Sequence, residues 1–192
     1  MNPSERLPIV GVMGSGREPH SHLAEPLGRW IGEHGFHLLM GGGGGAMLAV
    51  SRAFASTPNR RGHVIGIIPG DTSGAHYCCR PGFPNAYVEI AIFTHLPLTG
   101  ADGTQALSRN HINVLSSDVI VALPGGEGTA SEVQLALKYR KPTLAFLGEE
   151  GQIPGLPECV PTVRDNQLVR VGQFILAATN DWPARRFSSA GG

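Results

Sequence analysis

The stretch VIVALPGGEGTASEVQLALKY, residues 119–139, decides the fold of this chain. It opens with a continuous apolar run at 119–123, which is typical of a strand buried on both faces. A glycine-rich turn at 124–129 follows, and residues 130–139 then place apolar side chains at helical spacing. A strand, a glycine turn and a helix in this order predict one half of a βαβ unit.

The same unit recurs towards the N-terminus. Ile9–Met13 is a short apolar run that ends at a glycine turn, and Ser21–Glu33 behind it has helical spacing. A second apolar run at 36–40 leads into five consecutive glycines, Gly41 to Gly45, and a second helical pattern. The remaining elements are predicted as strands at 63–68, 86–93 and 143–147 and as helices at 105–116 and 165–178, with an irregular excursion at 71–85.

Short apolar strands that alternate with helices predict a parallel sheet, because parallel neighbours need crossover connections. The predicted fold class is therefore α/β: a Rossmann-like three-layer sandwich with a mostly parallel sheet and helices on both faces. Ligands bind to such sheets at the carboxyl ends of the strands. All three glycine turns follow strands, so we expect them to meet at one crevice.

The composition favours one domain with a small ligand. With 192 residues, 41% of them apolar, we expect a single nucleotide-binding domain over 1–192, a core at about 8–178 and a disordered tail at 187–192. The 15 basic residues balance the 15 acidic ones, which leaves no basic field for nucleic acid. No apolar run approaches the roughly 18 residues that span a bilayer, so the sequence predicts a cytoplasmic protein without a membrane partner.

The turn after the 119–123 strand has the features of an anion cradle. Glycines let the main chain approach a ligand closely, and the first amides of the following helix offer unpaired donors and a positive dipole end. The candidate phosphate-binding residues are Pro124, Gly125, Gly126, Gly128 and Thr129. A simpler interpretation stays open, because any tight turn between a strand and a helix favours glycine.

The two earlier glycine turns are candidates for the rest of the pocket. Gly14 and Ser15 follow the first strand, and Gly42, Gly43 and Gly44 follow the second. The second turn would bring its main chain close to the ligand, and the first would enclose a base or sugar. Both remain open to the interpretation that they are turns only.

Glu132 and Arg109 are the candidate reactive pair. Glu132, on the first turn of a phosphate-holding helix, would act as an acid or base about one sugar length from the anion. It also lies three residues after Thr129, so a capping box with no functional role is the alternative. Arg109 offers a planar fork for a phosphate or a carboxylate, although a lone helical arginine is usually a solvated surface group.

Other chemistries find little support in the sequence. The eight histidines lack Cys or carboxylate partners at metal-binding spacing, so no metal site is predicted. Three cysteines, two of them adjacent, favour free thiols. A dinucleotide-type GxGxxG after the first strand and a GxxxxGK[ST] loop are both missing from the sequence, which argues against hydride transfer and NTP hydrolysis.

Residues 124–132, PGGEGTASE, resemble the PGGxGTxxE signature of the LOG ("lonely guy") family, the cytokinin-activating phosphoribohydrolases. The wider group also contains the molybdenum cofactor carrier proteins. The resemblance extends over about 9–147 and takes in the GS turn at 14–15, GGGGGAM at 41–47, IIPG at 67–70 and KP at 141–142.

The resemblance implies a Rossmann-like homodimer or homotetramer that binds a nucleoside 5′-monophosphate against the PGGxGT turn. In the hydrolase branch the matching residues, Glu132 and Arg109, would be the catalytic pair that releases free base and ribose 5-phosphate. No cofactor would be required, and the bound molecule would be an AMP-like nucleotide or molybdenum cofactor.

One departure from the hydrolase pattern concerns the residue after the arginine. The hydrolases carry Arg-Lys where this chain has Arg109 and Asn110, and Asn110 is a further candidate ligand-binding residue. Together with the sequence NAY at 85–87, this pair resembles the carrier branch more closely. The sequence therefore predicts a protein that binds nucleoside 5′-monophosphates, with a phosphoribohydrolase as the leading function. A non-catalytic molybdenum cofactor carrier and a nucleotide sensor are the alternatives.

Overall fold

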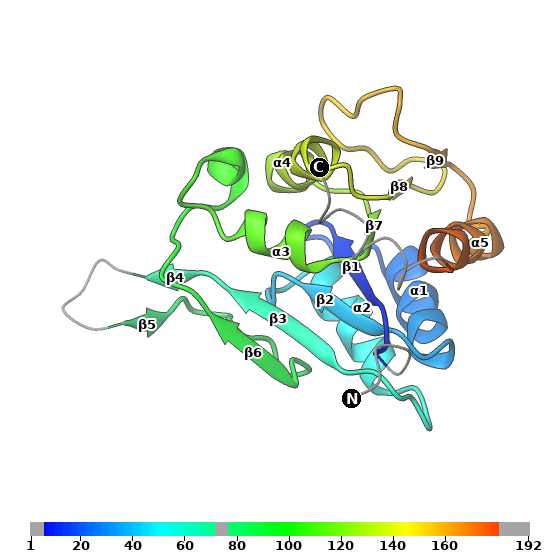
Figure 1. The fold of residues 1–192 in the computed structure, drawn as a ribbon, viewed down its shortest axis with the longest axis horizontal. Coiled ribbons are helices and arrows are strands. Elements are labelled where there is room, and N and C mark those ends of the chain that lie inside the picture. The colour runs from blue at the N-terminus through cyan, green and yellow to red at the C-terminus, as the bar shows by residue number, and fades with distance from the viewer. Residues whose placement is uncertain (1–5, 72–76, 181–192) are drawn as a thin grey trace, which may run out of the picture.

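The computed structural model describes residues 6–71 and 77–180 and places seven parallel strands side by side (Figure 1). Their order across the sheet is β6-β3-β2-β1-β7-β8-β9. The strands are β1 (Ile9–Met13), β2 (His37–Met40), β3 (Val64–Ile68), β6 (Ile90–Phe93), β7 (Val119–Ala122), β8 (Thr143–Phe146) and β9 (Thr162–Val163). The predicted α/β class with a mostly parallel sheet is confirmed.

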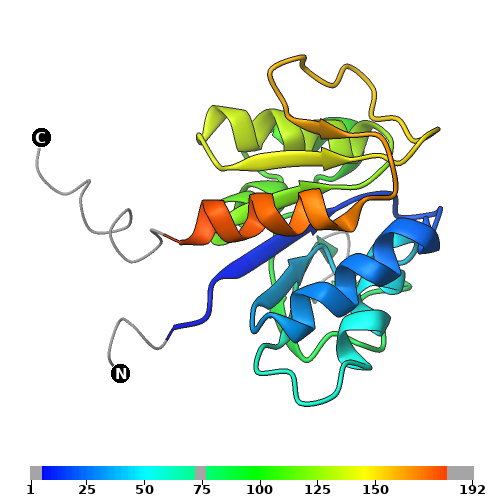
Figure 2. The same ribbon diagram turned by 90° about the vertical axis from the view of Figure 1, so that its right-hand side faces the viewer.

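Helices cover both faces of this sheet (Figures 1 and 2). One layer holds α1 (Ser21–Glu33), α2 (Ala46–Ala55) and α5 (Leu168–Thr179), which pack on one another and on the central strands. The other layer holds α3 (Asn110–Ser116) and α4 (Glu127–Lys138), which pack together and against β1, β7 and β8. Strands β1, β7 and β8 are buried along their whole length, as expected for a sheet enclosed between two helical layers.

Strand β1 is the point at which the chain changes direction across the sheet. It pairs with β2 on one side and with β7 on the other, so that Gly11 lies opposite both Leu39 and Ile120. The connections from β1 therefore lead one way and those from β7 the other. Such a switch point opens a crevice at the carboxyl ends of the two strands.

The segment predicted as an irregular excursion at 71–85 contains a short antiparallel pair. Strand β4 (Gly70–Asp71) pairs with β5 (Cys78–Cys79), and residues 72–76 lie outside the described part of the chain. The strand predicted from residue 86 begins only at Ile90, because Val88 closes a turn with its amide on the Asn85 carbonyl at 3.2 Å. The expected disordered tail at 187–192 also lies outside the described residues.

Three helix starts differ from the prediction, α5 beginning at Leu168 where residue 165 was predicted, and two elements were not expected. The helix predicted at 105–116 begins at Asn110, since the segment before it pairs with residue 98 and leaves Leu107 exposed. A 3₁₀ turn, η2 (Gly100–Thr104), precedes it. Helix α4 begins at Glu127, three residues earlier than predicted, and the two-residue strand β9 had no periodic signal.

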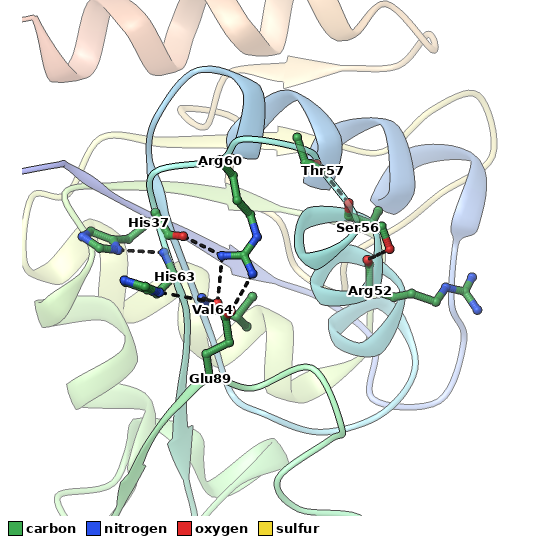
Figure 3. A network of polar contacts seen from close by, with 10 residues as sticks. His37, Arg52, Ser56, Thr57, Arg60, His63, Val64 and Glu89 are labelled. Carbon is green, nitrogen blue, oxygen red and sulfur yellow. Dashed lines mark hydrogen bonds and ion pairs between the residues drawn. The ribbon is translucent and has the colours of Figure 1, made fainter.

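A polar network connects the amino ends of β2, β3 and β6 (Figure 3). The glycine turns lie at the other, carboxyl ends of the strands. The Glu89 carboxylate accepts hydrogen bonds from the Arg60 guanidinium and, at 2.8 Å, from the Val64 amide. Burial opposes ionisation of Glu89, but these hydrogen bonds outweigh it and hold its pKa below the usual value. His63 lies 3.8 Å from the same carboxylate, and its amide donates to the His37 ring.

No helix in the described ranges, 6–71 and 77–180, is long and apolar enough to cross a membrane.

The contact between α1 and α2 gives the first prediction. A Cβ at Gly28 would lie 2.4 Å from the Val50 carbonyl oxygen, whereas a Cβ at Gly126 would meet nothing within 4 Å. Gly28→Ala should lower the free energy of unfolding by about 1–3 kcal/mol, because the two helices must separate. Gly126→Ala should lower it less, because this change removes only the preference of an N-cap for glycine over alanine. Urea unfolding of both variants measures the difference, and equal stabilities would contradict this packing.

Candidate functional site

The three glycine turns meet, and Ser15 joins them. The Ser15 amide donates to the Pro124 carbonyl at 3.1 Å, and its carbonyl accepts from the Ala46 amide at 2.9 Å. A Cβ at Gly14 would come within 3.1 Å of both Ala46 and Leu123, so only glycine lets the turns approach this closely. The ends of β1, β2 and β7 are thus held together at the switch point.

The turn between β7 and α4 leaves amides free at the start of the helix. The Gly125 amide donates to the Gln152 carbonyl, and the Ala130 amide to the Gly126 carbonyl, both at 3.0 Å. The amides of residues 126–129 have no hydrogen-bond partner within the described ranges. Gly126 is exposed and has open space on its Cα. The turn therefore offers an accessible group of donors at the positive end of α4.

The capping box that the sequence left open does not form. Helix α4 has Gly126 as its N-cap, so Thr129 is already the third helical residue. Thr129 is buried, and its Oγ1 lies 2.1 Å from the position that a Gly125 Cβ would occupy. The Glu132 carboxylate is therefore not used to cap the helix.

The glycine run after β2 is shaped by its neighbours. Gly42 and Gly45 have φ angles of 74° and 58°, which strain any residue with a Cβ. The Asn85 amide donates to the Gly42 carbonyl at 2.8 Å, and its Nδ2 donates to the Gly43 carbonyl at 2.9 Å. A Cβ at Gly44 would lie 3.3 Å from the Gly16 carbonyl. The predicted residues Gly42, Gly43 and Gly44 thus lie in the crevice wall, and Asn85 holds two of their carbonyls.

Arg109 lies under this wall and is buried. A Cβ at Gly41 would come within 2.2 Å of its Nη1 and 2.4 Å of its Nη2, so the guanidinium rests directly on the Gly41 Cα. Its Nε and Nη1 are buried and have no hydrogen-bond partner among the described residues. A buried cationic donor without an acceptor is unfavourable, which makes Arg109 a prepared receptor for an anion.

Glu132 is the negative group nearest to Arg109. Its Oε1 accepts a hydrogen bond from Asn113 Nδ2 at 2.9 Å, and the two side chains are buried. Burial raises the pKa of Glu132, although the Arg109 charge and the Asn113 hydrogen bond act in the opposite direction. Within the described ranges Glu132 and Arg109 attract one another without a direct ion pair. The guanidinium therefore keeps donors available.

Asn110, the last of the predicted ligand residues, is buried behind the turn. A Cβ at Gly103 would lie 2.4 Å from Asn110 Nδ2 and 2.7 Å from the Ser131 Cβ. Ser131 Oγ in turn donates to the Gly100 carbonyl at 3.0 Å. Asn110 therefore lies where η2 packs on the first turns of α4, next to the crevice but within its wall.

A hollow of about 410 Å³ lies on the other side of the Pro124 turn. It is bounded by the start of α1 and by the loop after β8, and its lining residues are His20, His22, Pro124, Leu147, Glu149, Glu150, Gly151 and Asn166. Within the described ranges, no three His, Cys, Asp or Glu side chains gather closely enough to hold a metal ion. Pro124 is the one residue of the three glycine turns that lines this hollow.

A family model described as the SLOG cluster4 family matches residues 7–178. The chain belongs to this family. An uncharacterized protein of Archaeoglobus fulgidus is 32% identical over 138 residues, which cover 71% of this chain and 78% of the relative. The resemblance to LOG-type proteins that the PGGxGTxxE motif carries is thereby confirmed.

Solved structures similar to this SLOG cluster4 chain include two described as binding or carrying molybdenum cofactor. The carrier protein of Chlamydomonas reinhardtii is 29% identical with a TM-score of 0.64, over 88% of this chain and 99% of its own. The molybdenum cofactor binding protein of Rippkaea orientalis is 31% identical with a TM-score of 0.62, over 90% and 99%. A third structure, TM1055, is 21% identical with a TM-score of 0.63 and shares the fold.

Sequence reasoning missed three residues of this SLOG cluster4 site. Gly41 gives Arg109 its place, Asn113 binds Glu132, and Asn85 holds the glycine run. Gly41 had a signal, because it is the first glycine after a predicted strand. Asn85 had a signal in the NAY sequence at 85–87, although its contact with the glycine run did not follow from it. Asn113 had none, since its contact depends on how two helices pack.

Glu132 gives a prediction about the pH dependence of stability. Its folded-state pKa is raised, so above about pH 4.5 the native state binds more protons than the unfolded state and loses stability as pH rises. Glu132→Gln removes this titration. Its free energy of unfolding, relative to the unmodified protein, should therefore increase as pH rises above about 4.5, by at most about 1.4 kcal/mol per pH unit.

Urea unfolding from pH 4.5 to pH 8 measures this difference. Glu33→Gln, at an exposed glutamate at the end of α1, is the control and should show no such trend. A relative stability of Glu132→Gln that decreases with rising pH would mean that the Glu132 carboxylate is ionised and stabilising in the folded protein.

Proposed function

We propose that this chain is a cytoplasmic carrier that binds molybdenum cofactor, a phosphorylated pterin, without breaking a bond in it. The observation that supports a phosphorylated ligand is the Arg109 guanidinium, buried against Gly41 with two unpartnered nitrogens. The free amides at the start of α4 provide further donors to the same anion. The likeness to carriers of molybdenum cofactor at 29–31% identity favours this cargo among phosphorylated ligands.

The residues of the crevice fit such a cargo. The phosphate would be held by Arg109 and by the amides around Gly126, Gly128 and Thr129. The pterin would lie along Gly42, Gly43 and Gly44, whose bare main chain gives a flat ring access. The Gly14 and Ser15 turn would close the other side. We further expect a homodimer or homotetramer, as in the resemblance from which this proposal starts.

A nucleoside 5′-monophosphate phosphoribohydrolase is the second candidate, and the raised pKa of Glu132 favours it. A buried carboxyl that keeps its proton can donate it to a leaving base, while water adds to the anomeric carbon. The products would be free base and ribose 5-phosphate. The asparagine at 110, where the hydrolases have lysine, and the Asn113 hydrogen bond to Glu132 favour binding without turnover.

Retention of cargo tests the carrier proposal. The protein, purified from a host that makes molybdenum cofactor, should carry a pterin that fluoresces after acid release and oxidation, together with molybdenum measured by elemental analysis. Arg109→Gln should reduce both at least tenfold, because the anion loses its charged partner. Gly41→Ala should act in the same way, since a Cβ would displace the guanidinium.

Arg61→Gln is the matched control for this experiment. Arg61 is exposed and precedes β3, at the opposite edge of the sheet from the glycine turns, so its loss should leave the cargo unchanged. A protein that retains neither pterin nor molybdenum from such a host would contradict the carrier proposal.

Base release tests the hydrolase. AMP incubated with the purified protein should yield no adenine above the rate of a Glu132→Gln sample if the protein is a carrier. Adenine and ribose 5-phosphate formed in equal amounts, and lost in Glu132→Gln, would establish the hydrolase instead. Liquid chromatography of the reaction mixture distinguishes the two.

A further inference from the structure

A second arginine, Arg80, lies near enough to Arg109 for its charge to act on it, although no motif points to Arg80. It directly follows β5, and its Nη2 donates to the Pro97 carbonyl at 2.6 Å. The next residue, Leu98, pairs with Ser108, which directly precedes Arg109. The Arg80 hydrogen bond to Pro97 and the pairing of Leu98 with Ser108 thus place the Arg80 guanidinium near the start of α3.

The main chain after Arg80 turns back onto the glycine run. The Phe83 amide donates to the Arg80 carbonyl at 3.1 Å, and the Phe83 ring lies 2.9 Å from the position of a Gly43 Cβ. Asn85, two residues further on, holds the Gly42 and Gly43 carbonyls. The 80–85 segment therefore lies against the glycine run, whose first residue, Gly41, packs on the Arg109 guanidinium.

The two arginines leave an excess of positive charge at this place. Burial lowers the pKa of Arg109, the Glu132 charge raises it, and the positive charge of Arg80 lowers it further. Arg109 remains a cation, because guanidinium groups do not lose their proton in proteins. Glu132 is the one described carboxyl that acts on it, and burial keeps that group towards its neutral form. Two like charges near one another disfavour the folded state, and an anion bound between them would relieve that repulsion.

We propose that Arg80 is a ligand-binding residue and that Arg80 and Arg109 hold the same phosphoryl group, which enters as a dianion. The inference rests on the proposed binding of a phosphorylated ligand. It adds a second arginine that binds the phosphate and the requirement that the phosphate is a dianion. A phosphate monoester carries close to two negative charges above its second pKa of about 6. Two guanidinium groups match that charge, and each offers a planar set of donors to its oxygens.

A purely structural role is the alternative for Arg80. The bond to Pro97 alone would fasten the β5 strand to the loop before η2, and a neutral donor would serve as well. A ligand-binding role differs in one measurable way. It makes the protein distinguish a dianionic phosphate from a monoanionic one, because the second ligand charge needs the second cation.

The experiment compares two probes that differ by one charge. AMP is a phosphate monoester and a dianion at pH 8, whereas its methyl ester is a monoanion. Isothermal titration at pH 8 should find AMP bound at least tenfold more tightly than the ester. Arg80→Gln should weaken AMP binding about 10- to 100-fold and the ester much less, since a hydrogen bond to a charged group is lost from the dianion. Arg80→Lys should retain part of the preference.

Three outcomes separate the proposals. An Arg80→Gln protein that keeps the preference for AMP over its ester, or that loses affinity for both probes equally, would overturn the role of Arg80 and leave the proposed function standing. A protein that binds neither probe nor inorganic phosphate would also overturn the role of Arg80, whereas the retention of pterin and molybdenum decides the proposed function separately. Arg61→Gln, the exposed arginine at the far edge, is the control and should bind as the unmodified protein does. Circular dichroism and urea unfolding confirm that each variant is folded.

Discussion

The main chain of Ser15 is the constraint on which the site depends. Its amide binds the turn after β7, and its carbonyl binds the start of α2 behind the glycine run. A parallel sheet alone would bring three strand ends to one edge, but it would leave their loops free to diverge. Because one residue is hydrogen-bonded to both neighbours, the loops become one surface. Gly14 permits this, since a side chain there would push Ala46 and Leu123 apart.

Two charged side chains buried beneath that surface, Arg109 and Glu132, lower the stability of the fold. The Arg109 guanidinium, whose Nε and Nη1 find no acceptor in the described part of the chain, and the buried Glu132 carboxyl with its raised pKa both oppose folding. The chain tolerates them because the surrounding layers are apolar and closely packed, with Phe54, Leu27 and Val121 fully buried. An anion that entered the crevice would relieve the Arg109 charge, so ligand and fold would stabilise one another. This is the arrangement expected of a protein that must hold its cargo firmly.

The sequence predicted the strands and the convergence of the glycine turns because both follow from periodicity and from the rules of parallel sheets. It also placed Glu132 and Arg109 at one site through the family resemblance. It did not predict that Asn85 would bind the glycine run across more than 40 residues. Nor did it point to Arg80, whose place depends on the path of an unpatterned loop. The capping-box interpretation of Glu132 failed because α4 starts at the glycines themselves.

The contact between Gly41 and Arg109 has a consequence for how this lineage can evolve. The two residues are 68 positions apart, yet a change in either one alone disturbs the packing. Any larger residue at 41 would displace the guanidinium, and a shorter side chain at 109 would leave a void under the glycine run. Descendants that keep the pocket should therefore keep both positions together. Relatives in which the two residues have changed together would no longer have a buried guanidinium under the glycine run.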